Sequence, residues 1–345
     1  MDFFDGIMEI RLNHTLCRTR SEVIAAATPE VADFLDEWFS PAGFVQGHTS
    51  GSTGEPKPLR LLKSDMEASA RLTNDFFGIT SGTVMLLCLS PDYIAGKMMI
   101  VRALLAGADL LVVPPSSLPL ATIDEPVDFA AMVPAQVVES LKRDVHRSKL
   151  SRITSLIIGG APLSSATEAE LDTLPVCSYA TYGMTETVSH VALRRIGDPS
   201  MNYKALGNVT FTADERECLV IHAPHFSVRQ FVTNDVVALV DDRNFRWIGR
   251  YDHVINSGGV KVFPERVEQK IAALLSRRFF ITACADEKWG ESVLLVIEGD
   301  AFPPDREADL LARIRAVVDK YEYPHSVVYL PVFEETSSGK VIRAL

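Results

Sequence analysis

The first half of the chain alternates short apolar runs with longer amphipathic stretches, and Gly or Pro residues bound many of them. Apolar residues that recur at spacings of three and four predict helices at Lys97–Ala106 and Ala135–Val145. The apolar runs predict strands at Val84–Leu89, Ala108–Val113, Phe129–Val133 and Ser155–Ile158. Strands that alternate with helices in this way are typical of an α/β fold.

Beyond Val176 the pattern changes to strand-like segments, predicted at Glu217–His222, Val236–Val240 and Phe245–Ile248. An Asp-Asp-Arg-Asn turn joins the last two. The chain then restarts as an α+β region, with elements expected at Lys261–Phe263, Glu265–Leu275, Ile281–Ala285, Ser292–Glu298, Arg306–Lys320 and Ser326–Leu330. We therefore expect a large N-terminal α/β domain over residues 1–251 and a small C-terminal α+β domain over residues 252–345.

Composition limits the kinds of partner. The 345 residues are 47% hydrophobic, which allows a large core. The net charge of -11 argues against a nucleic-acid or anionic-membrane binder, so an anionic ligand must meet a local basic site. The five cysteines are scattered without a C-x-x-C pair, and they signal neither zinc nor a disulfide framework. The acidic N-terminus and the lack of a long apolar run predict a cytoplasmic protein without membrane insertion.

The segment His48–Lys57 combines glycine, hydroxyl and lysine residues between a predicted strand and a predicted helix. Glycine lets backbone N–H groups approach anionic oxygens, hydroxyls donate to the same oxygens, and lysine adds a point charge. The segment therefore predicts a polyphosphate grip, although its spacing is not that of a Walker A loop. A flexible surface loop is the alternative. The candidate phosphate-binding residues are Thr49, Ser50, Gly51, Ser52, Thr53, Gly54 and Lys57.

Five further segments follow this loop along the chain, and each is a weak pattern by itself. They are Gly159-Gly160-Ala161-Pro162-Leu163, Tyr182-Gly183-Met184-Thr185-Glu186, Asn234-Asp235, Gly249-Arg250-Tyr251-Asp252 through Ser257-Gly258-Gly259 to Pro264-Glu265, and Gly339-Lys340. Together and in this order they resemble the adenylate-forming superfamily of acyl-CoA synthetases, luciferases and peptide-synthetase adenylation domains. The resemblance implies a large domain with an ATP and acyl cleft and a small, mobile C-terminal domain.

The resemblance also implies ATP and Mg²⁺ as ligands. Glu186 is expected to hold Mg²⁺, because a hard ion shared with phosphates needs only one or two protein oxygens. Thr185 is expected at the α-phosphate and Tyr182 against adenine. Asp235 is expected at the ribose hydroxyls, and Arg250 at the ribose or a phosphate, although a surface ion pair is the alternative for Arg250. The remaining residues of the expected nucleotide site are Gly160, Ala161, Pro162 and Gly183.

One departure from the family pattern and several further assignments follow from the same resemblance. The usual Thr-Gly-Asp triad is Thr-Asn-Asp here, and Asn234 is expected to replace glycine because Asn tolerates a positive φ. Lys340 is expected to bridge the substrate carboxylate and the α-phosphate, with a disordered tail as the alternative. Asp252 matches the hinge of the small domain. The segment that hinge rotation brings to the pantetheine tunnel of CoA is Asn256, Ser257, Gly258 and Gly259.

The acyl substrate is harder to read from the sequence. Tyr93 stands where the family usually has His, and only a short segment precedes the phosphate loop, so one subdomain is expected to be reduced. The short chain and the run Ile-Ala-Gly-Lys-Met-Met resemble the bacterial o-succinylbenzoate-CoA ligases of menaquinone biosynthesis. The second carboxylate of such a substrate needs a polar or basic pocket. Lys97 is the first candidate, with a snorkelling lysine as the alternative, and Thr187, Ser189 and His190 are further candidates.

Several functions remain open on the sequence. The preferred reading is an acid-thiol ligase that adenylates o-succinylbenzoate and transfers the acyl group to CoA. The alternatives are a ligase for another aryl or fatty acid, a stand-alone adenylation domain that loads a carrier protein, and a nucleotide-binding relative without turnover. The joint presence of Glu186, Asp235, Arg250 and Lys340 argues against the last.

Overall fold

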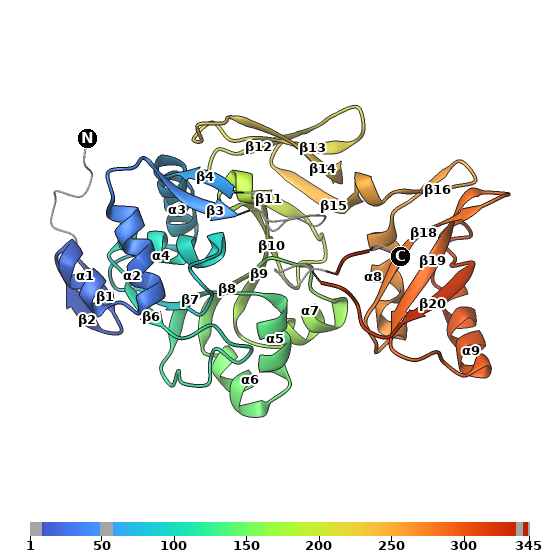
Figure 1. Ribbon diagram of the computed structural model, residues 1–345, viewed down its shortest axis with the longest axis horizontal. Helices are drawn as coiled ribbons and strands as arrows, with labels where there is room; N and C mark the ends of the chain where they lie inside the picture. The colour runs from blue at the N-terminus through green and yellow to red at the C-terminus, as the bar shows by residue number, and fades with distance from the viewer. Residues whose placement is uncertain (1–8, 49–57, 336–340, 344–345) are drawn as a thin grey trace. The chain divides into compact units, whose positions relative to one another are not determined.

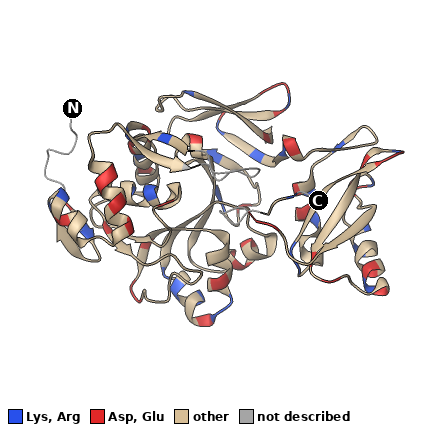
Figure 2. Cartoon of the chain, in the orientation of Figure 1, with Lys and Arg blue, Asp and Glu red and all other residues tan. Residues whose placement is uncertain are grey.

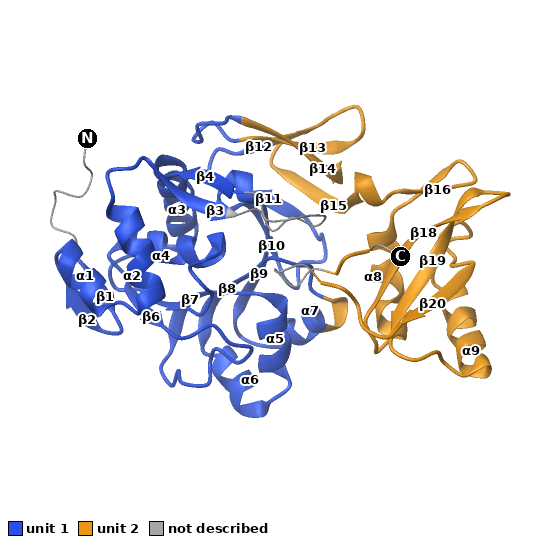
Figure 3. Ribbon diagram, in the orientation of Figure 1, with its two compact units in different colours: residues 1–163, 167–210, 223–229 blue, residues 164–166, 211–222, 230–345 orange. Residues whose placement is uncertain are grey.

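The computed structural model describes residues 9–48, 58–335 and 341–343 (Figure 1). The chain forms two compact units (Figure 3). Unit 1 comprises residues 1–163, 167–210 and 223–229, and unit 2 comprises residues 164–166, 211–222 and 230–345. Both units contain helices and strands, so the predicted α/β class is confirmed. The domain boundary and the hinge expected at Asp252 stay predictions.

Unit 1 is built on one twisted sheet with the strand order β11-β10-β9-β8-β7-β5-β6-β1-β2. The six neighbouring strands β9, β8, β7, β5, β6 and β1 pair in parallel. At one edge β10 and β11 pair antiparallel, and at the other edge β2 pairs antiparallel with β1. The strands are β1 (Ile10–Leu12), β2 (Thr15–Cys17), β5 (Val84–Leu87), β6 (Asp109–Val112), β7 (Val127–Met132), β8 (Ile153–Ile158), β9 (Cys177–Gly183), β10 (His190–Arg195) and β11 (Tyr203–Ala205). A separate hairpin pairs β3 (Phe44–His48) with β4 (Pro58–Leu62).

Helices cover both faces of this sheet, because its central strands are apolar on both sides. On one face Ala130 and Leu156 pack in the same apolar cluster as Val137 and Leu141 of α5. On the other face Phe129 contacts Phe77 of α3, with ring centres 4.9 Å apart. The helices are α1 (Arg20–Ala26), α2 (Pro29–Phe39), α3 (Lys63–Phe77), α4 (Ile94–Ala106), α5 (Pro134–Leu141), α6 (Asp144–Leu150) and α7 (Ser165–Asp172), with the 3₁₀ turn η1 (Thr185–Thr187).

Helix α4 is buried nearly all round, from Gly96 to Leu104. A Cβ at Gly96 would overlap the backbone of Ser90, so glycine lets the first turn approach that loop. The helix ends at Gly107, which has a φ of 67° and whose N–H donates to Leu104. This helix places Lys97 and Arg102 inside unit 1, although long cationic side chains are almost never fully buried without a partner.

The predicted strands of unit 1 are confirmed, but one helix prediction is wrong. The helix expected at Ala135–Val145 is two helices, because Arg143 is extended with φ −126° and ψ 122° and α6 begins at Asp144. Val145, read as part of the apolar face, is 66% exposed. An apolar spacing that continued across a helix break caused the error.

Unit 2 contains two sheets. The first has the order β12-β13-β14-β15, and the second has the order β17-β16-β19-β18 with β20 parallel to β19. The strands are β12 (Thr210–Ala213), β13 (Cys218–His222), β14 (Gln230–Leu239), β15 (Asn244–Arg250), β16 (Ile255–Ser257), β17 (Val260–Val262), β18 (Phe279–Asp286), β19 (Gly290–Glu298) and β20 (Ser326–Leu330). The helices are α8 (Pro264–Ile271) and α9 (Pro304–Arg315), with the 3₁₀ turns η2 (Tyr251–His253) and η3 (Ala272–Leu274).

Helices α8 and α9 pack on one face of the second sheet, where Val267 and Ile314 share an apolar cluster with Ile281 and Leu295. The helix predicted to reach Lys320 stops at Arg315. The N–H groups of residues 316–318 donate back to Arg313 and Ile314. Lys270 pairs with both Asp319 and Glu322, which stabilises the segment as a turn instead of a further helical turn.

Acidic and basic residues are interspersed on the helices of both units (Figure 2). Within the described residues, no helix is long and apolar enough to span a membrane. The five cysteines are free.

Candidate functional site

Unit 1 presents two of the predicted motifs at the carboxyl ends of adjacent parallel strands. Gly160, Ala161 and Pro162 follow β8, and Tyr182 lies at the end of β9. Ligands of open α/β sheets bind at this edge. Gly160 has a φ of 90°, and Tyr182 packs edge-to-face on Tyr203 with ring centres 5.8 Å apart. The structure thus brings together the residues expected around adenine.

The turn after β9 presents Glu186 to solvent. A Cβ at Gly183 would overlap the backbone of Ser189 and His190, so only glycine allows this close approach. Thr187 is buried, and its hydroxyl donates to Met184 or Ser189 while accepting from the Met184 N–H. It therefore supports the turn that carries Thr185 and Glu186. An exposed carboxylate on a fixed turn fits the predicted Mg²⁺ ligand.

Behind this turn lies a buried polar cluster that the sequence interpretation did not identify. Arg102 is 2% exposed, and its Nη2 donates to Ser189 Oγ at 2.6 Å while its Nη1 lies 3.7 Å from Met99 Sδ. Among the described residues no carboxylate forms an ion pair with it, and its Nε has no hydrogen-bond partner. Burial lowers the pKa of Arg102 to about 9. The available signal was one arginine within an apolar helical run.

His190 belongs to the same cluster. Its Nε2 lies 3.3 Å from Thr73 Oγ1, and its Nδ1 lies 3.3 Å from Ser189 Oγ. Burial, with a smaller contribution from Arg102, lowers the pKa of His190 well below its usual value. The imidazole is therefore neutral at pH 7. Of the three lower-ranked substrate candidates, Ser189 contacts both Arg102 and His190, whereas the Thr187 hydroxyl bonds within its own turn.

A second buried arginine shows the contrasting arrangement. Arg194 is 6% exposed, and it donates to both carboxylate oxygens of Glu168 at 2.5 and 3.1 Å. Burial disfavours its charge, but the Glu168 carboxylate and Tyr203 raise the pKa of Arg194 overall. This arginine has its counter-ion within the fold.

Lys97 is buried as well, but it already has partners. Its Nζ lies 3.9 Å from Glu37 Oε2 and 4.9 Å from the ring centre of Phe34, both on α2. Burial lowers the pKa of Lys97, and Glu37 opposes that effect. Tyr93 precedes α4 and is 50% exposed. The predicted substrate roles of Lys97 and Tyr93 stay predictions.

In unit 2 the structure brings together Asp235 of β14, Arg250 at the end of β15 and Asp252 in the turn η2. Asp235 pairs across the ladder with Arg250, whose guanidinium lies 3.9 Å from Asp235 and 2.7 Å from Asp252. Trp247 Nε1 donates to Asp235 at 3.2 Å. The carboxylate and guanidinium expected at the ribose therefore lie side by side.

The explanation offered for Asn234 is wrong. Asn234 lies within β14 and is not among the non-glycine residues with a positive φ. Its side chain instead donates to Asp252 at 3.1 Å and accepts from Arg216 at 3.0 Å. Asn234 thus replaces glycine by linking β14 to the segment after β15, and not by adopting a left-handed backbone.

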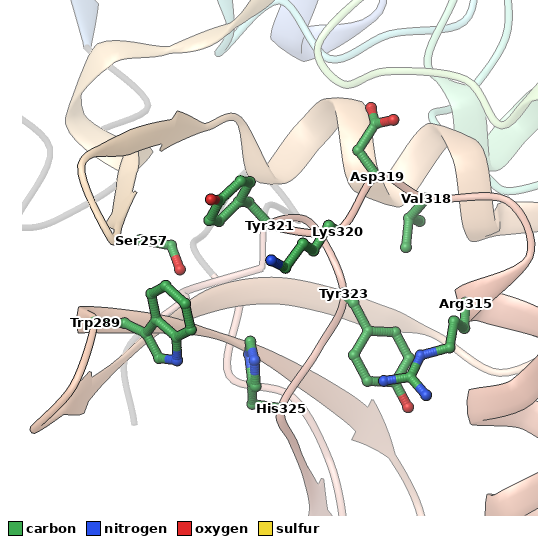
Figure 4. A pocket seen from close by; sticks show the side chains of 9 residues that line it. All are labelled: Ser257, Trp289, Arg315, Val318, Asp319, Lys320, Tyr321, Tyr323 and His325. Carbon is green, nitrogen blue, oxygen red and sulfur yellow. The ribbon is translucent and has the colours of Figure 1, made fainter.

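Asn256 and Ser257 end β16, and Gly258 and Gly259 form the turn to β17, with φ values of 58° and 82°. The Gly258 N–H donates to Trp289 O at 2.9 Å, and a Cβ at Gly258 would overlap the Trp289 ring. Beside this turn lies a cavity of about 320 Å³ (Figure 4). Aromatic and cationic side chains dominate its lining, which comprises Ser257, Trp289, Arg315, Val318, Asp319, Lys320, Tyr321, Tyr323 and His325.

The phosphate loop Thr49–Lys57 and Lys340 lie outside the described residues. The loop is flanked by strands that pair with each other, Gly47 with Leu59 and His48 with Pro58. Lys340 is flanked by Glu335 and Val341, which form an antiparallel bridge. The roles of the loop and of Lys340 stay predictions.

Sequence comparisons connect this geometry to known proteins. The family model described as AMP-binding enzyme matches residues 44–221. The chain is 27% identical over 321 residues to a Mycobacterium tuberculosis protein named probable 2-succinylbenzoate–CoA ligase, covering 86% of this chain and 82% of that protein. It is 24% identical over 353 residues to the 2-succinylbenzoate–CoA ligase of Bacillus cytotoxicus, covering 91% and 72%.

The solved structures that resemble this chain also include acyl-CoA synthetases. An acyl-CoA synthetase (AMP-forming)/AMP-acid ligase II-like protein from Dyadobacter fermentans is 36% identical, with a TM-score of 0.62 and coverage of 94% of this chain and 96% of that one. The Bacillus subtilis O-succinylbenzoate coenzyme A synthetase, in complex with ATP and magnesium ion, has a TM-score of 0.73 at 18% identity. That match covers 86% of this chain and 68% of the other, and it shows a shared fold.

Proposed function

The chain belongs to the AMP-binding enzyme family, and we propose from this premise that it is an ATP-dependent acid-thiol ligase for a dicarboxylic aryl acid, o-succinylbenzoate first. In the first half-reaction a substrate carboxylate attacks the α-phosphorus of ATP, which forms the acyl-adenylate and releases pyrophosphate. In the second, the CoA sulfur attacks the acyl carbon after loss of the thiol proton. AMP leaves and a thioester forms.

Arg102 is the observation that carries the choice of a dicarboxylic acid. A buried guanidinium without a counter-ion is unfavourable, because burial removes its hydration without an opposite charge in return. Among the described residues Arg102 has only the Ser189 hydroxyl and the Met99 sulfur. A substrate carboxylate that is not activated would supply the missing charge. Ser189 lies three residues after Glu186, so such a carboxylate would be held close to the adenylation motif.

The nucleotide would be held by the remaining motif residues. In unit 1, Tyr182 and the backbone after β8 would contact adenine, Thr185 would contact the α-phosphate, and Glu186 would hold Mg²⁺. The ion supplies charge neutralisation of the phosphates when bound. In unit 2, Asp235 would accept hydrogen bonds from the ribose hydroxyls, and its side-by-side position with Arg250 at 3.9 Å supports this role. The phosphate loop and Lys340 would complete the set.

The cavity beside Ser257 supports free CoA as the acyl acceptor, rather than a carrier protein. Trp289, Tyr321 and Tyr323 offer aromatic faces to an adenine base, and Arg315, Lys320 and His325 offer donors to phosphates. Figure 4 shows Trp289 on one side of this cavity and Arg315 with Tyr323 on the other. A carrier protein would present a phosphopantetheine arm that lacks the adenosine.

The experiment is acid-dependent pyrophosphate release with a panel of carboxylic acids, followed by mass detection of the thioester. We expect o-succinylbenzoate to exceed matched monocarboxylates. Clear turnover of a monocarboxylate with none of o-succinylbenzoate would contradict the proposed substrate.

The choice of free CoA as the acceptor is tested at Trp289. Trp289→Ala should raise KM for CoA about tenfold, since stacking on one base contributes about 1–3 kcal/mol, and leave pyrophosphate release unchanged. An unchanged KM for CoA, or loading of a carrier protein in preference to CoA, would contradict the proposal that free CoA is the acyl acceptor.

A further inference from the structure

A series of hydrogen bonds joins Arg102 to helix α3 through Ser189 and His190. Arg102 Nη2 donates to Ser189 Oγ at 2.6 Å, and Ser189 Oγ lies 3.3 Å from His190 Nδ1. On the other side of the ring, His190 Nε2 lies 3.3 Å from Thr73 Oγ1. The Thr73 hydroxyl in turn donates to Ser69 O at 3.2 Å, within α3.

The direction of these hydrogen bonds follows from the number of donors and acceptors. Because the Thr73 hydroxyl donates to Ser69 O, its oxygen accepts from His190 Nε2. The neutral ring then has no proton on Nδ1, so Nδ1 accepts from the Ser189 hydroxyl, and Ser189 Oγ accepts from Arg102. With the proton on Nδ1 instead, the Ser189 hydroxyl would have no acceptor among the described residues.

The surroundings of His190 require the neutral ring. His190 and Thr73 are both buried. Burial, with the nearby charge of Arg102, holds the pKa of His190 well below its usual value. A protonated ring would place a second cation beside Arg102 and would change Nδ1 from an acceptor into a donor. The Ser189 hydroxyl would then lose its acceptor on the ring.

Helix α3 contacts Arg102 at its backbone as well. Asn74 Nδ2 donates to the Arg102 carbonyl oxygen at 3.0 Å, and Asn74 directly follows Thr73. Two adjacent residues of α3 therefore hold the backbone of Arg102 and, through His190 and Ser189, one nitrogen of its guanidinium. Arg102 Nε and Nη1 have no oxygen acceptor within the part of the chain that the structure describes.

We infer that His190 is a positioning residue for Arg102, acting through the Ser189 hydroxyl. The inference depends on the proposed function. The neutral ring accepts the hydrogen bond of the hydroxyl, so a lone pair of Ser189 Oγ faces Arg102 Nη2 and fixes the orientation of the guanidinium. A substrate carboxylate then meets a cation that is already oriented, and less binding free energy is lost in ordering a long side chain. His190 itself does not contact the substrate, in contrast to its predicted role as a lining residue.

Two substitutions of the histidine test this role. His190→Asn keeps an acceptor at the δ position, whereas His190→Leu is of comparable size and has none. We expect His190→Leu to raise KM for o-succinylbenzoate about tenfold, or about 1.4 kcal/mol, the size of one buried hydrogen bond. Its kcat, its KM for ATP and its KM for a monocarboxylate analogue should change less than about threefold. His190→Asn should stay within about threefold in all four quantities.

The tautomer of His190 provides a direct readout that a merely structural role would not move. Nitrogen NMR of the imidazole at pH 7 should show a neutral ring with its proton on Nε2. A proton on Nδ1, or a charged ring, would overturn the inference. His225→Leu is the matched control for the kinetics, because His225 is a half-buried histidine of unit 1 whose Nδ1 contacts Asn208 instead.

The decisive variant combines His190→Leu with Ser189→Ala. If His190 acts only through Ser189, the double variant raises KM for the dicarboxylate no more than Ser189→Ala alone. A further rise in the double variant, or an unchanged KM in His190→Leu, would overturn the positioning role and leave the proposed function intact. An unsubstituted chain that releases no pyrophosphate with any dicarboxylic acid defeats the proposed function and the inference with it. Thermal unfolding identifies a variant that is not folded, and in that case the tautomer in the unsubstituted chain decides.

Discussion

Two buried arginines of unit 1 differ in one respect, the presence of a counter-ion. Arg194 is 6% exposed and donates to both oxygens of Glu168, whereas Arg102 is 2% exposed and, among the described residues, contacts only a hydroxyl and a thioether. The charge of Arg194 is compensated by a carboxylate within the fold. The charge of Arg102 is compensated by no carboxylate of the described residues, and Arg102 lies under the turn that carries Glu186. Burial alone therefore does not distinguish the two arginines, and the missing carboxylate partner is the difference on which the proposed binding role of Arg102 depends.

The largest effect is expected on stability at the paired arginine. Arg194→Gln leaves the Glu168 carboxylate, whose side chain is only 15% exposed, without its ion-pair partner, which should reduce the free energy of unfolding by about 3 kcal/mol. Denaturant unfolding measures this change. Activity per folded molecule should stay close to that of the unsubstituted chain. A rise in KM for the acid or a fall in kcat, measured per folded molecule, would make Arg194 a binding residue and erase the contrast.

Substitution of Arg102, which has no carboxylate partner among the described residues, should affect catalysis more than stability. Arg102→Gln should reduce kcat/KM for o-succinylbenzoate about 100-fold, or about 2.7 kcal/mol, while KM for ATP changes little. Steady-state kinetics with a dicarboxylate and its monocarboxylate analogue measure the difference. Stability should fall by less than in Arg194→Gln, because no carboxylate is left behind. An equal loss with both acids would remove Arg102 from the recognition of the second carboxylate.

The histidine of the same cluster provides a pH test. The pKa of His190 is lowered by burial, so below about pH 6.5 the unfolded chain binds a proton that the folded chain does not. The free energy of unfolding should therefore fall as the pH falls through this range, by at most about 1.4 kcal/mol per pH unit. His190→Asn should flatten the profile of stability against pH between about 5 and 6.5. An unchanged profile would mean that His190 is charged in the fold.

The smallest effect is expected at the third buried cation, Lys97. Because Lys97 lies against Glu37 and Phe34, Lys97→Met should change KM for the acid less than about threefold. Stability should change by about 1 kcal/mol or less, because Glu37 is half-buried and can be hydrated. This outcome would favour Arg102, and not Lys97, as the residue that binds the second carboxylate of the substrate. A KM for the acid that rises far more than KM for ATP would restore Lys97, the sequence-based candidate.

Much of the fold and part of the site could be predicted from the sequence. The strands from β5 to β8 and the C-terminal sheet follow from local apolar runs bounded by Gly and Pro, which need no knowledge of neighbours. The end of α9 at Arg315 and the break at Arg143 could not be predicted in this way. The first depends on Lys270 holding Asp319 and Glu322, and the second on a backbone change within one continuous apolar pattern.

The sequence by itself determined the chemistry of the family, because spaced motifs of Gly, Glu, Asp, Arg and Lys carry their residue types in the order of the chain. It also predicted that Asp235 and Arg250 belong to one nucleotide-binding pattern. Only the tertiary structure decided which buried cation has no carboxylate partner among the described residues, and which contacts the Asn234 side chain makes. Each of these depends on side chains that are distant along the chain, and burial and pairing arise only when the fold brings those side chains together.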